Sequence, residues 1–250
     1  MTRRVAARPR DYVRVAGRDA EDFLQRMLSN DVTSAPCRAL LLTPKSRVIA
    51  PVVIVRRADE DFLLLTEPGL GEAVSSTLLR ARFAAKVEIE PEEHTSVVVF
   101  GEENGIPNSE FGEGASELLD ADVEPTLSAE ELEQQRIEAG TPAWGKEIDD
   151  SILPAEAGLD ETHISFTKGC YPGQEPIARL RNRGKVNRRL RVLQVERARP
   201  GDEIRAGGKV VGRVTSAAEG LALGYVRVEV PGDAELEVGT DAKTAWTRTP

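Results

Sequence analysis

The sequence predicts an α+β fold in two parts, with a mixed region over residues 1–186 and a small antiparallel β-barrel over 187–250. Three observations lead to this prediction. Apolar residues recur at helical spacing soon after the start, strand-like runs alternate with turn residues up to about residue 100, and a period of two dominates after residue 190. A chain of 250 residues can bury a sizeable core without a disulfide or a metal ion. We expect the mixed region to form two intertwined subdomains.

The first helix is predicted to begin at Asp19, a good N-cap residue, and to end near Asn30. Its apolar face carries Phe23, Leu24, Met27 and Leu28. Further along the chain, the patterns predict strands at 39–43, 48–56 and 62–66, a helix at 70–83, and strands near 86–90 and 96–100. The basic residues 1–9 have no hydrophobic stretch after them, so we expect a surface tail and not a secretory signal.

The segment from Glu102 to Glu138 contains twelve acidic residues and one basic residue, Arg136. Its first part has several glycines and no periodicity, which predicts a solvated connection between elements. Near its end, Ser128 and Glu131 have the spacing of a capping box, so a helix is expected there, with Gly140 as its stop. Arg136 and Glu138 near the end of this helix could lie at a functional site or on an exposed helical face.

The C-terminal part reads as antiparallel strands. Alternating apolar residues mark strands at 190–195, 209–214 and 221–228, and shorter segments lie near 235–238 and 242–247. The pair Gly207-Gly208 is a strong signal for a two-residue hairpin turn. These strands suffice for a small barrel whose border we place near Val186.

The most informative segment is Lys168-Gly169-Cys170-Tyr171-Pro172-Gly173-Gln174-Glu175. Its glycines allow positive φ or close approach of a ligand to the backbone, and a thiol beside a lysine is expected to have a lowered pKa. The alternative is a small buried cysteine in an ordinary turn. Gln174 and Glu175 could brace this loop, and Arg179 has the spacing to pair with Glu175.

The chain becomes strongly basic directly after this loop. From Lys168 to Arg191 there are eight basic residues and one acid, a local charge of +7 in a protein whose net charge is −9. Such a cationic segment in an acidic protein is expected to attract an anionic ligand.

The loop resembles the signature of the YgfZ family, the folate-binding, iron–sulfur-associated relatives of the glycine-cleavage T-protein, an aminomethyltransferase. The similarity extends over residues 15–190 in several short motifs, which in order are Gly17 to Val32, Arg136 to Pro142, Trp144 to Ile148, and Leu153 to Leu159. The order and spacing of these motifs carry more weight than any one of them.

The resemblance implies T-protein-like domains around a tetrahydrofolate pocket. It assigns Glu156 as the hydrogen-bonding partner of the pterin, and the basic segment, including Arg179, can hold the glutamate tail through charge-assisted contacts. Trp144 could line the pocket or belong to the core. Asn30, Arg136 and Glu138 lie in the shared motifs and are further candidates for cofactor binding.

The sequence departs from the T-protein at one position important for mechanism. Aminomethyltransferases carry an acidic pair where this chain has Ala50-Pro51, and they lack the cysteine loop. This argues against aminomethyl transfer and favours a non-classical folate-dependent factor for the assembly or repair of iron–sulfur enzymes, including those that modify tRNA. Cys170 and Lys168 would be its reactive residues. A one-carbon transferase with a different substrate is the alternative.

A single cysteine cannot complete a four-thiolate cluster site, so Cys170 is expected at most to share a transient iron or cluster with a partner. The second cysteine, Cys37, is expected to be a packing residue. His163 is the only histidine near the loop and could serve as a base, but the resemblance does not include it. The partners implied are a folate and iron–sulfur proteins or their assembly machinery.

The remaining composition excludes several classes of protein. No apolar run approaches the roughly 18 residues that span a bilayer, and the two cysteines have no metal-binding spacing, so we expect a cytoplasmic protein with no membrane partner. An Arg-rich nucleic-acid-binding module is a third functional class. The pI of about 5.0 and the lack of interleaved aromatic residues argue against direct nucleic-acid binding.

Overall fold

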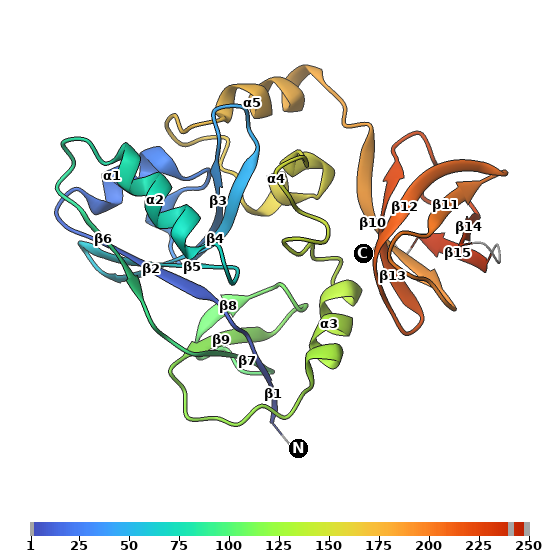
Figure 1. Ribbon diagram of the computed structural model, residues 1–250, viewed down its shortest axis with the longest axis horizontal. Helices are drawn as coiled ribbons and strands as arrows, with labels where there is room; N and C mark the ends of the chain where they lie inside the picture. Colours follow the sequence, from blue (N-terminus) through green and yellow to red (C-terminus); the bar gives the residue numbers. More distant parts are fainter. Residues whose placement is uncertain (1–2, 240–242, 248–250) are drawn as a thin grey trace.

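A computed structural model describes residues 3–239 and 243–247 of the protein. Two antiparallel sheets form one half of the molecule and a closed barrel forms the other, with helical segments between them (Figure 1). The predicted α+β fold with a C-terminal β-barrel is thus confirmed.

The first sheet has five strands in the order β3-β4-β5-β2-β6. The strands are β2 (Asp11–Ala16), β3 (Cys37–Leu42), β4 (Val48–Ala58), β5 (Asp61–Thr66) and β6 (Glu88–Glu92). Because strand side chains alternate between faces, one face packs against α1 (Ala20–Met27) and α2 (Gly71–Ala81), with Phe23 and Leu78 in the shared core. The short 3₁₀ helix η1 (Val32–Ser34) follows α1.

The start of α1 differs from the prediction in one respect. Asp19 occupies the N-cap position, but its side chain makes no capping hydrogen bond with the helix. Instead Asp19 Oδ2 accepts a hydrogen bond from the backbone N–H of Lys86, at 2.7 Å. The aspartate therefore joins the helix start to a distant loop, a contact that local spacing does not encode.

The second sheet has four strands in the order β1-β7-β9-β8, and it corrects two predictions. Its strands are β1 (Arg4–Ala7), β7 (Ser96–Phe100), β8 (Ile106–Asn108) and β9 (Ala115–Leu119). The expected N-terminal surface tail is wrong over residues 4–7, because β1 pairs with β7 and buries Val5 and Ala6. The expected solvated connection is also wrong over β8 and β9, where Glu117 is buried against Arg10, at 2.7 Å.

Helix α3 (Ala129–Glu138) joins this half of the molecule to the barrel, and its predicted start is confirmed. Ser128 Oγ accepts a hydrogen bond from the N–H of Glu131, and the Glu131 carboxylate accepts one from the N–H of Ser128. These two bonds satisfy two N–H groups that lack partners at a helix start. The chain leaves the helix through Gly140, at φ +72°.

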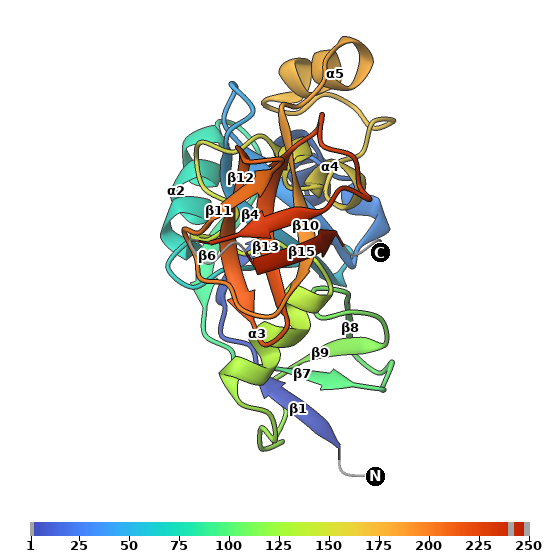
Figure 2. The ribbon, with the colours of Figure 1, turned by 90° about the vertical axis from the view of Figure 1, so that its right-hand side faces the viewer.

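The barrel is closed by six strands in the order β10-β13-β12-β11-β14-β15 (Figure 2). They are β10 (Arg188–Val195), β11 (Glu203–Ala206), β12 (Lys209–Ala218), β13 (Leu221–Arg227), β14 (Leu236–Val238) and β15 (Lys243–Thr247). The predicted Gly207-Gly208 hairpin is confirmed, with both residues at positive φ between β11 and β12. The last predicted strand segment was 242–247, and its first residue, 242, lies outside the described residues. The division of the chain near Val186 stays a prediction.

Three short helical elements connect the two halves. They are η2 (Pro154–Glu156), α4 (Leu159–Thr162) and α5 (Gln174–Arg183). Figure 1 shows α5 along the upper edge of the molecule, with the chain descending from it into β10. The 153–159 motif and the basic segment therefore lie where the sheets and the barrel come together.

Candidate functional site

The loop from Lys168 to Gly173 ends at the start of α5 and presents Cys170 to solvent, whereas Tyr171 is buried beside it. The Tyr171 side chain packs in a core shared with β3, β4 and the barrel residue Tyr225. Burial raises the pKa of the Tyr171 hydroxyl to about 12, so it stays protonated at physiological pH. The buried tyrosine anchors the loop and leaves the neighbouring thiol accessible.

Lys168 fixes the loop to the end of the first helix. Its Nζ donates hydrogen bonds of 2.7 Å to the carbonyl oxygens of Leu28 and Asn30, and lies 5.5 Å from the centre of the Tyr171 ring. Burial lowers the pKa of Lys168 to about 8, against the opposing attraction of Asp31. The ammonium group is thus committed to backbone carbonyls, and its role in this structure is to position the loop.

Gly173 is the residue whose backbone most requires glycine. It precedes α5 with φ +83°, and a Cβ there would lie 2.6 Å from the carbonyl oxygen of Thr43. Ser46 Oγ donates a 2.6 Å hydrogen bond to the Gly173 carbonyl. Gly169, in contrast, has no atom within 4 Å of an added Cβ and no positive φ, so the loop uses its two glycines differently.

We expect Gly173→Ala to lower the free energy of unfolding by about 2 kcal/mol, because the side chain would meet backbone atoms in a left-handed conformation. Urea denaturation would measure this loss. The matched control is Gly169→Ala, for which a change of less than about 0.5 kcal/mol is expected. Equal effects from the two substitutions would contradict this account of the loop.

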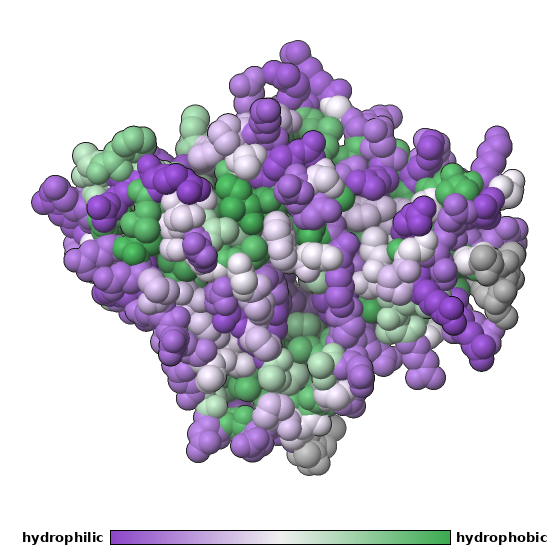
Figure 3. Space-filling view, viewed as in Figure 1, coloured by the Kyte–Doolittle hydropathy of each residue, from purple (hydrophilic) through white to green (hydrophobic). Residues whose placement is uncertain are grey.

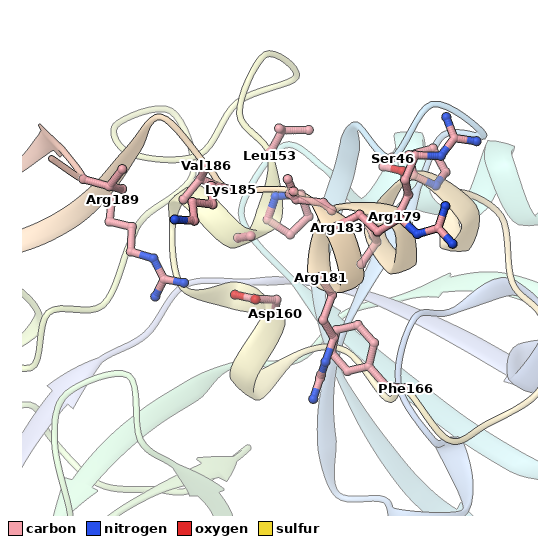
Figure 4. Close-up of a pocket in the computed structure, with 17 residues that line it drawn as sticks. Ser46, Leu153, Asp160, Phe166, Arg179, Arg181, Arg183, Lys185, Val186 and Arg189 are labelled. Carbon is pink, nitrogen blue, oxygen red and sulfur yellow. The ribbon is translucent and has the colours of Figure 1, made fainter.

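A cavity of about 800 Å³ lies between α5, α4, η2 and the start of the barrel. Its apolar wall includes Leu153, Phe166, Ile177 and Leu180, and its basic residues are Arg179, Arg181, Arg183, Lys185 and Arg189. The Arg181 guanidinium lies 3.7 Å from the centre of the Phe166 ring (Figure 4). Figure 3 shows hydrophilic side chains over the upper edge of the molecule, where α5 runs. The cavity therefore combines an apolar wall with a cationic rim.

The cations around the cavity differ in how they are paired. Arg179 forms the predicted pair with Glu175, at 2.8 Å, on the exposed surface of α5. Arg189 lies 3.9 Å from Glu161. Within residues 3–239 and 243–247, Arg183 and Lys185 have no acidic partner, so their charge is available to a ligand.

Glu156 lies beside the cavity wall but is already engaged. Its Oε1 accepts a 3.0 Å hydrogen bond from Arg188 Nε, and its Oε2 accepts one from the N–H of Leu153, at 3.2 Å. The Arg188 guanidinium also lies 4.8 Å from the Tyr225 ring. A ligand that bound the Glu156 carboxylate would have to share it with these protein donors.

Arg136 is buried between α3 and the barrel, away from solvent. Its guanidinium donates hydrogen bonds to Glu133, Glu147, Ser216 and the carbonyl oxygen of Thr141. Ser216 Oγ donates in turn to Glu147, at 2.6 Å. All the donors of Arg136 therefore have protein partners, so it joins α3 to the barrel and has none left for a cofactor. Its neighbour Glu138 is exposed.

The other predicted cofactor residues have structural contacts. Asn30 Nδ2 donates a 2.7 Å hydrogen bond to the carbonyl oxygen of Arg38, and its Oδ1 accepts one from the N–H of Asp31. Trp144 is partly buried and packs between two core clusters. Each shapes the region between the halves of the molecule, and neither lines the cavity under α5.

Two further candidate residues, Cys37 and His163, do not line the cavity. Cys37 is half-buried, and burial raises the pKa of its thiol. His163 is buried, and burial together with the positive charge of Arg38 lowers its pKa to about 3, so it is neutral at physiological pH. No group of three or more metal-binding side chains occurs in the described part of the chain.

The sequence interpretation missed three residues of this site. Ser46 supports Gly173, Phe166 stacks on Arg181, and Asp160 is the one acid among the described residues that line the cavity. The Ser46 contact spans 127 residues and left no local signal. Asp160 directly follows the 153–159 motif and could have been found by extending that motif by one residue.

Comparison with known proteins agrees with this architecture. Residues 187–249 match the family model described as CAF17, C-terminal beta-barrel domain. The tRNA-modifying protein YgfZ of Edwardsiella ictaluri is 37% identical over 127 residues, which cover 46% of this chain and 38% of that protein. The iron-sulfur cluster assembly factor IBA57 homolog of Neurospora crassa is 28% identical over 248 residues, covering 80% of this chain and 55% of that protein.

These comparisons support a T-protein-like family of the YgfZ and IBA57 type for this chain. The fold of the chain is also similar to that of the glycine cleavage system aminomethyltransferase T from Bartonella henselae. That structure has a TM-score of 0.81 at 18% identity and matches 96% of this chain and 83% of its own. The aligned regions thus span most of the aminomethyltransferase but less than two thirds of the two relatives.

No helix among the described residues is both long and apolar enough to cross a bilayer.

Proposed function

We propose that this protein is a tetrahydrofolate-binding accessory factor for iron–sulfur enzymes, including tRNA-modifying ones, with Cys170 as its reactive group. The names of its relatives, a tRNA-modifying protein and an iron-sulfur cluster assembly factor, support this class of function. The similarity of its fold to an aminomethyltransferase supports a folate ligand. We infer a cytoplasmic location for this activity.

The observation that carries the proposal is the cavity under α5. A folate has an aromatic, largely apolar body and a negatively charged glutamate tail, and the cavity offers an apolar wall and a cationic rim. Phe166, Ile177 and Leu180 would contact the rings, and Arg181 and Lys185 would hold the tail carboxylates through charge-assisted hydrogen bonds. The volume of about 800 Å³ lies in the range typical of small-molecule sites.

The position of Cys170 suits a reaction with a second protein. Its thiol is exposed on the loop that leads into α5, one wall of the cavity. A thiolate is a soft ligand for iron, but one cysteine needs further ligands to hold a cluster. An iron–sulfur cluster would therefore be a cargo shared with a partner at this surface.

Aminomethyl transfer is the less favoured function. The positions that resemblance assigns to an acidic pair hold Ala50, which is fully buried, and Pro51. Neither side chain can accept a proton or stabilise a developing positive charge. Formation of a one-carbon product from tetrahydrofolate would revive this alternative.

An anaerobic calorimetric titration with tetrahydrofolate tests the proposal. We expect saturable binding in the micromolar range, and roughly tenfold weaker binding by Arg181→Gln, because a charge-assisted contact contributes about 1.4 kcal/mol. The matched control is Arg26→Gln, which changes an exposed arginine on α1 that is paired with the exposed Asp22. Absence of binding by the wild-type protein would refute the folate function.

A further inference from the structure

The loop between β6 and β7 carries His94, whose imidazole ring lies between two carboxylates. Its Nε2 is 2.9 Å from Glu92 Oε2, at the end of β6, and its Nδ1 is 2.6 Å from Asp120 Oδ2, directly after β9. Because β6 belongs to the first sheet and β9 to the second, one ring contacts a carboxylate beside each sheet (Figure 1). None of these three residues lines the cavity under α5.

Only a protonated His94 can make both contacts as hydrogen bonds. A neutral imidazole has one N–H group and one nitrogen lone pair, whereas the imidazolium ion has two N–H donors. Both partners are held in the ionised form. A hydrogen bond from Arg57, helped by His94, lowers the pKa of Glu92 to about 2, and hydrogen bonds from Thr95 and His94 lower the pKa of Asp120. A neutral ring would therefore direct its lone pair at one of two negative charges.

The other charged groups around the ring also favour its protonated form. Arg57 donates a 2.7 Å hydrogen bond to Glu92, and Arg14 lies 3.6 Å from the same carboxylate, so part of that negative charge is compensated. Within residues 3–239 and 243–247, His94 is the one basic group within 4.0 Å of the Asp120 carboxylate. A hollow beside the ring is lined by four more charged side chains, which are Arg10, Asp11, Glu72 and Glu93. Three of these four are acidic, and negative charge stabilises an imidazolium ion.

Asp120 has an unusual backbone conformation, which its contacts hold in place. Its φ is +49°, a region that non-glycine residues seldom adopt. Its Oδ1 accepts a 2.9 Å hydrogen bond from the N–H of Thr95, and its own N–H donates to the Thr95 carbonyl oxygen, at 2.8 Å. The His94 ring packs edge-on against Tyr12, at 5.1 Å, and Tyr12 belongs to a core formed by both sheets. These contacts therefore close one edge of the interface between the sheets.

We propose that Glu92, His94 and Asp120 form a proton-controlled clasp between the two sheets. The protonated ring holds Asp120 and the end of β9 against β6, and loss of the proton releases them. Hydrogen bonds to Asp120 and then to Glu92 raise the pKa of His94 above its ordinary value of 6.5. The clasp thus contributes its full stability below pH 6.5, and this contribution is lost as the pH rises through the raised pKa. The clasp is independent of the proposed function.

NMR titration of the imidazole rings tests the protonation of the clasp. The protein has two histidines, and because burial lowers the pKa of His163 to about 3, His94 is the one expected to titrate near neutral pH. We expect a midpoint above 6.5 in the wild-type protein and a lower one in Asp120→Asn. Asparagine tolerates positive φ and keeps an oxygen for the N–H of Thr95, so this variant should fold. A wild-type midpoint at or below 6.5 would contradict the clasp.

Urea unfolding and hydrogen exchange test whether the proton controls the contact. The urea midpoint of the wild type minus that of His94→Gln should fall as the pH rises through the titration of His94, because the variant lacks the titrating group. Amide protection at Thr95 and Asp120, corrected for intrinsic exchange, should fall over the same range, whereas that of Leu64 in the centre of β5 should not. Asp122→Asn, at an exposed acid two residues after Asp120, is the matched control and should behave as the wild type does.

Two results would overturn the clasp. One is a difference in urea midpoint that does not change with pH, or an equal loss of protection in the wild type and His94→Gln. The other is a parallel fall in protection at Leu64, which would mean that the whole sheet opens and not its edge. Neither result would bear on the folate titration, so the two proposals fail separately.

Discussion

Alanine in place of Cys170 is expected to abolish the ability of the protein to restore iron–sulfur enzyme activity in cells that lack it. The Cys170 thiol is the exposed sulfur among the described residues, and no other side chain in the loop can act as a soft ligand or a nucleophile toward a cluster. Activity of an iron–sulfur enzyme in extracts should fall to the level of cells without the protein. The purified variant should unfold at the same urea concentration as the wild type, since an exposed side chain contributes little to stability.

Cys37→Ala supplies the matched control for this experiment. The Cys37 thiol is half-buried, contacts the carbonyl oxygen of Asp31 at 3.4 Å, and has a pKa raised by burial. Such a thiol reacts poorly, so this variant should restore enzyme activity fully. If Cys170→Ala restored enzyme activity fully, the loop cysteine would have no part in the mechanism. If a folded Cys37→Ala variant failed to restore activity, Cys37 would be the cysteine that the function requires.

Substitution of Arg136 by Met should lower the free energy of unfolding by about 3–5 kcal/mol. Removing one partner of a buried ion pair leaves the other charge without compensation, and Glu147 is fully buried here. Ser216 would also lose its guanidinium donor. Urea denaturation followed by circular dichroism would measure the effect.

Lys146→Ala is the corresponding control for Arg136. Lys146 also pairs with Glu133, but about half of its side chain is exposed, so a loss of at most about 1 kcal/mol is expected. If Arg136→Met lowered the free energy of unfolding by no more than this control does, the buried network would not be what holds α3 against the barrel. A folate-binding role for Arg136 would then become worth testing again.

The features that the sequence predicted well are those encoded by neighbouring residues. Period-two patterns identified the barrel strands, Gly207-Gly208 identified a hairpin, and Ser128 with Glu131 identified a helix start. In each case the physical cause lies within a few residues of the element, as a side-chain alternation, a positive φ or a local hydrogen bond.

The features that it predicted poorly depend on partners far along the chain. Strand β9 lies within the acidic segment from Glu102 to Glu138 and was expected to be solvated, but Arg10 forms an ion pair with its Glu117 across 107 residues. Strand β1 lies in the basic N-terminal segment and joins the sheet through pairing with β7. A charged segment can be buried when its counter-charges arrive from elsewhere, and a single sequence does not reveal where they are.

In the candidate site, too, the features encoded by neighbouring residues were predicted and those that depend on distant residues were not. The loop and the basic segment were found because they are contiguous; the basic segment lines the cavity, and the loop leads into α5, one wall of it. The assignment of Glu156 came from a motif, whereas its engagement by Arg188 depends on how β10 passes η2. Asp160 carries no motif and becomes conspicuous only through its unsatisfied oxygen.

The attachment of Lys168 has a consequence for how this family can vary. Its ammonium binds the carbonyl oxygens of Leu28 and Asn30, which every amino acid provides. Residue 28 could therefore change its side chain between relatives without breaking the contact, while position 168 must keep a long cationic side chain. The contact between the loop and the end of α1 would therefore leave no paired substitutions in an alignment of relatives. A mechanically essential connection in this protein can thus be invisible to methods that infer contacts from covariation.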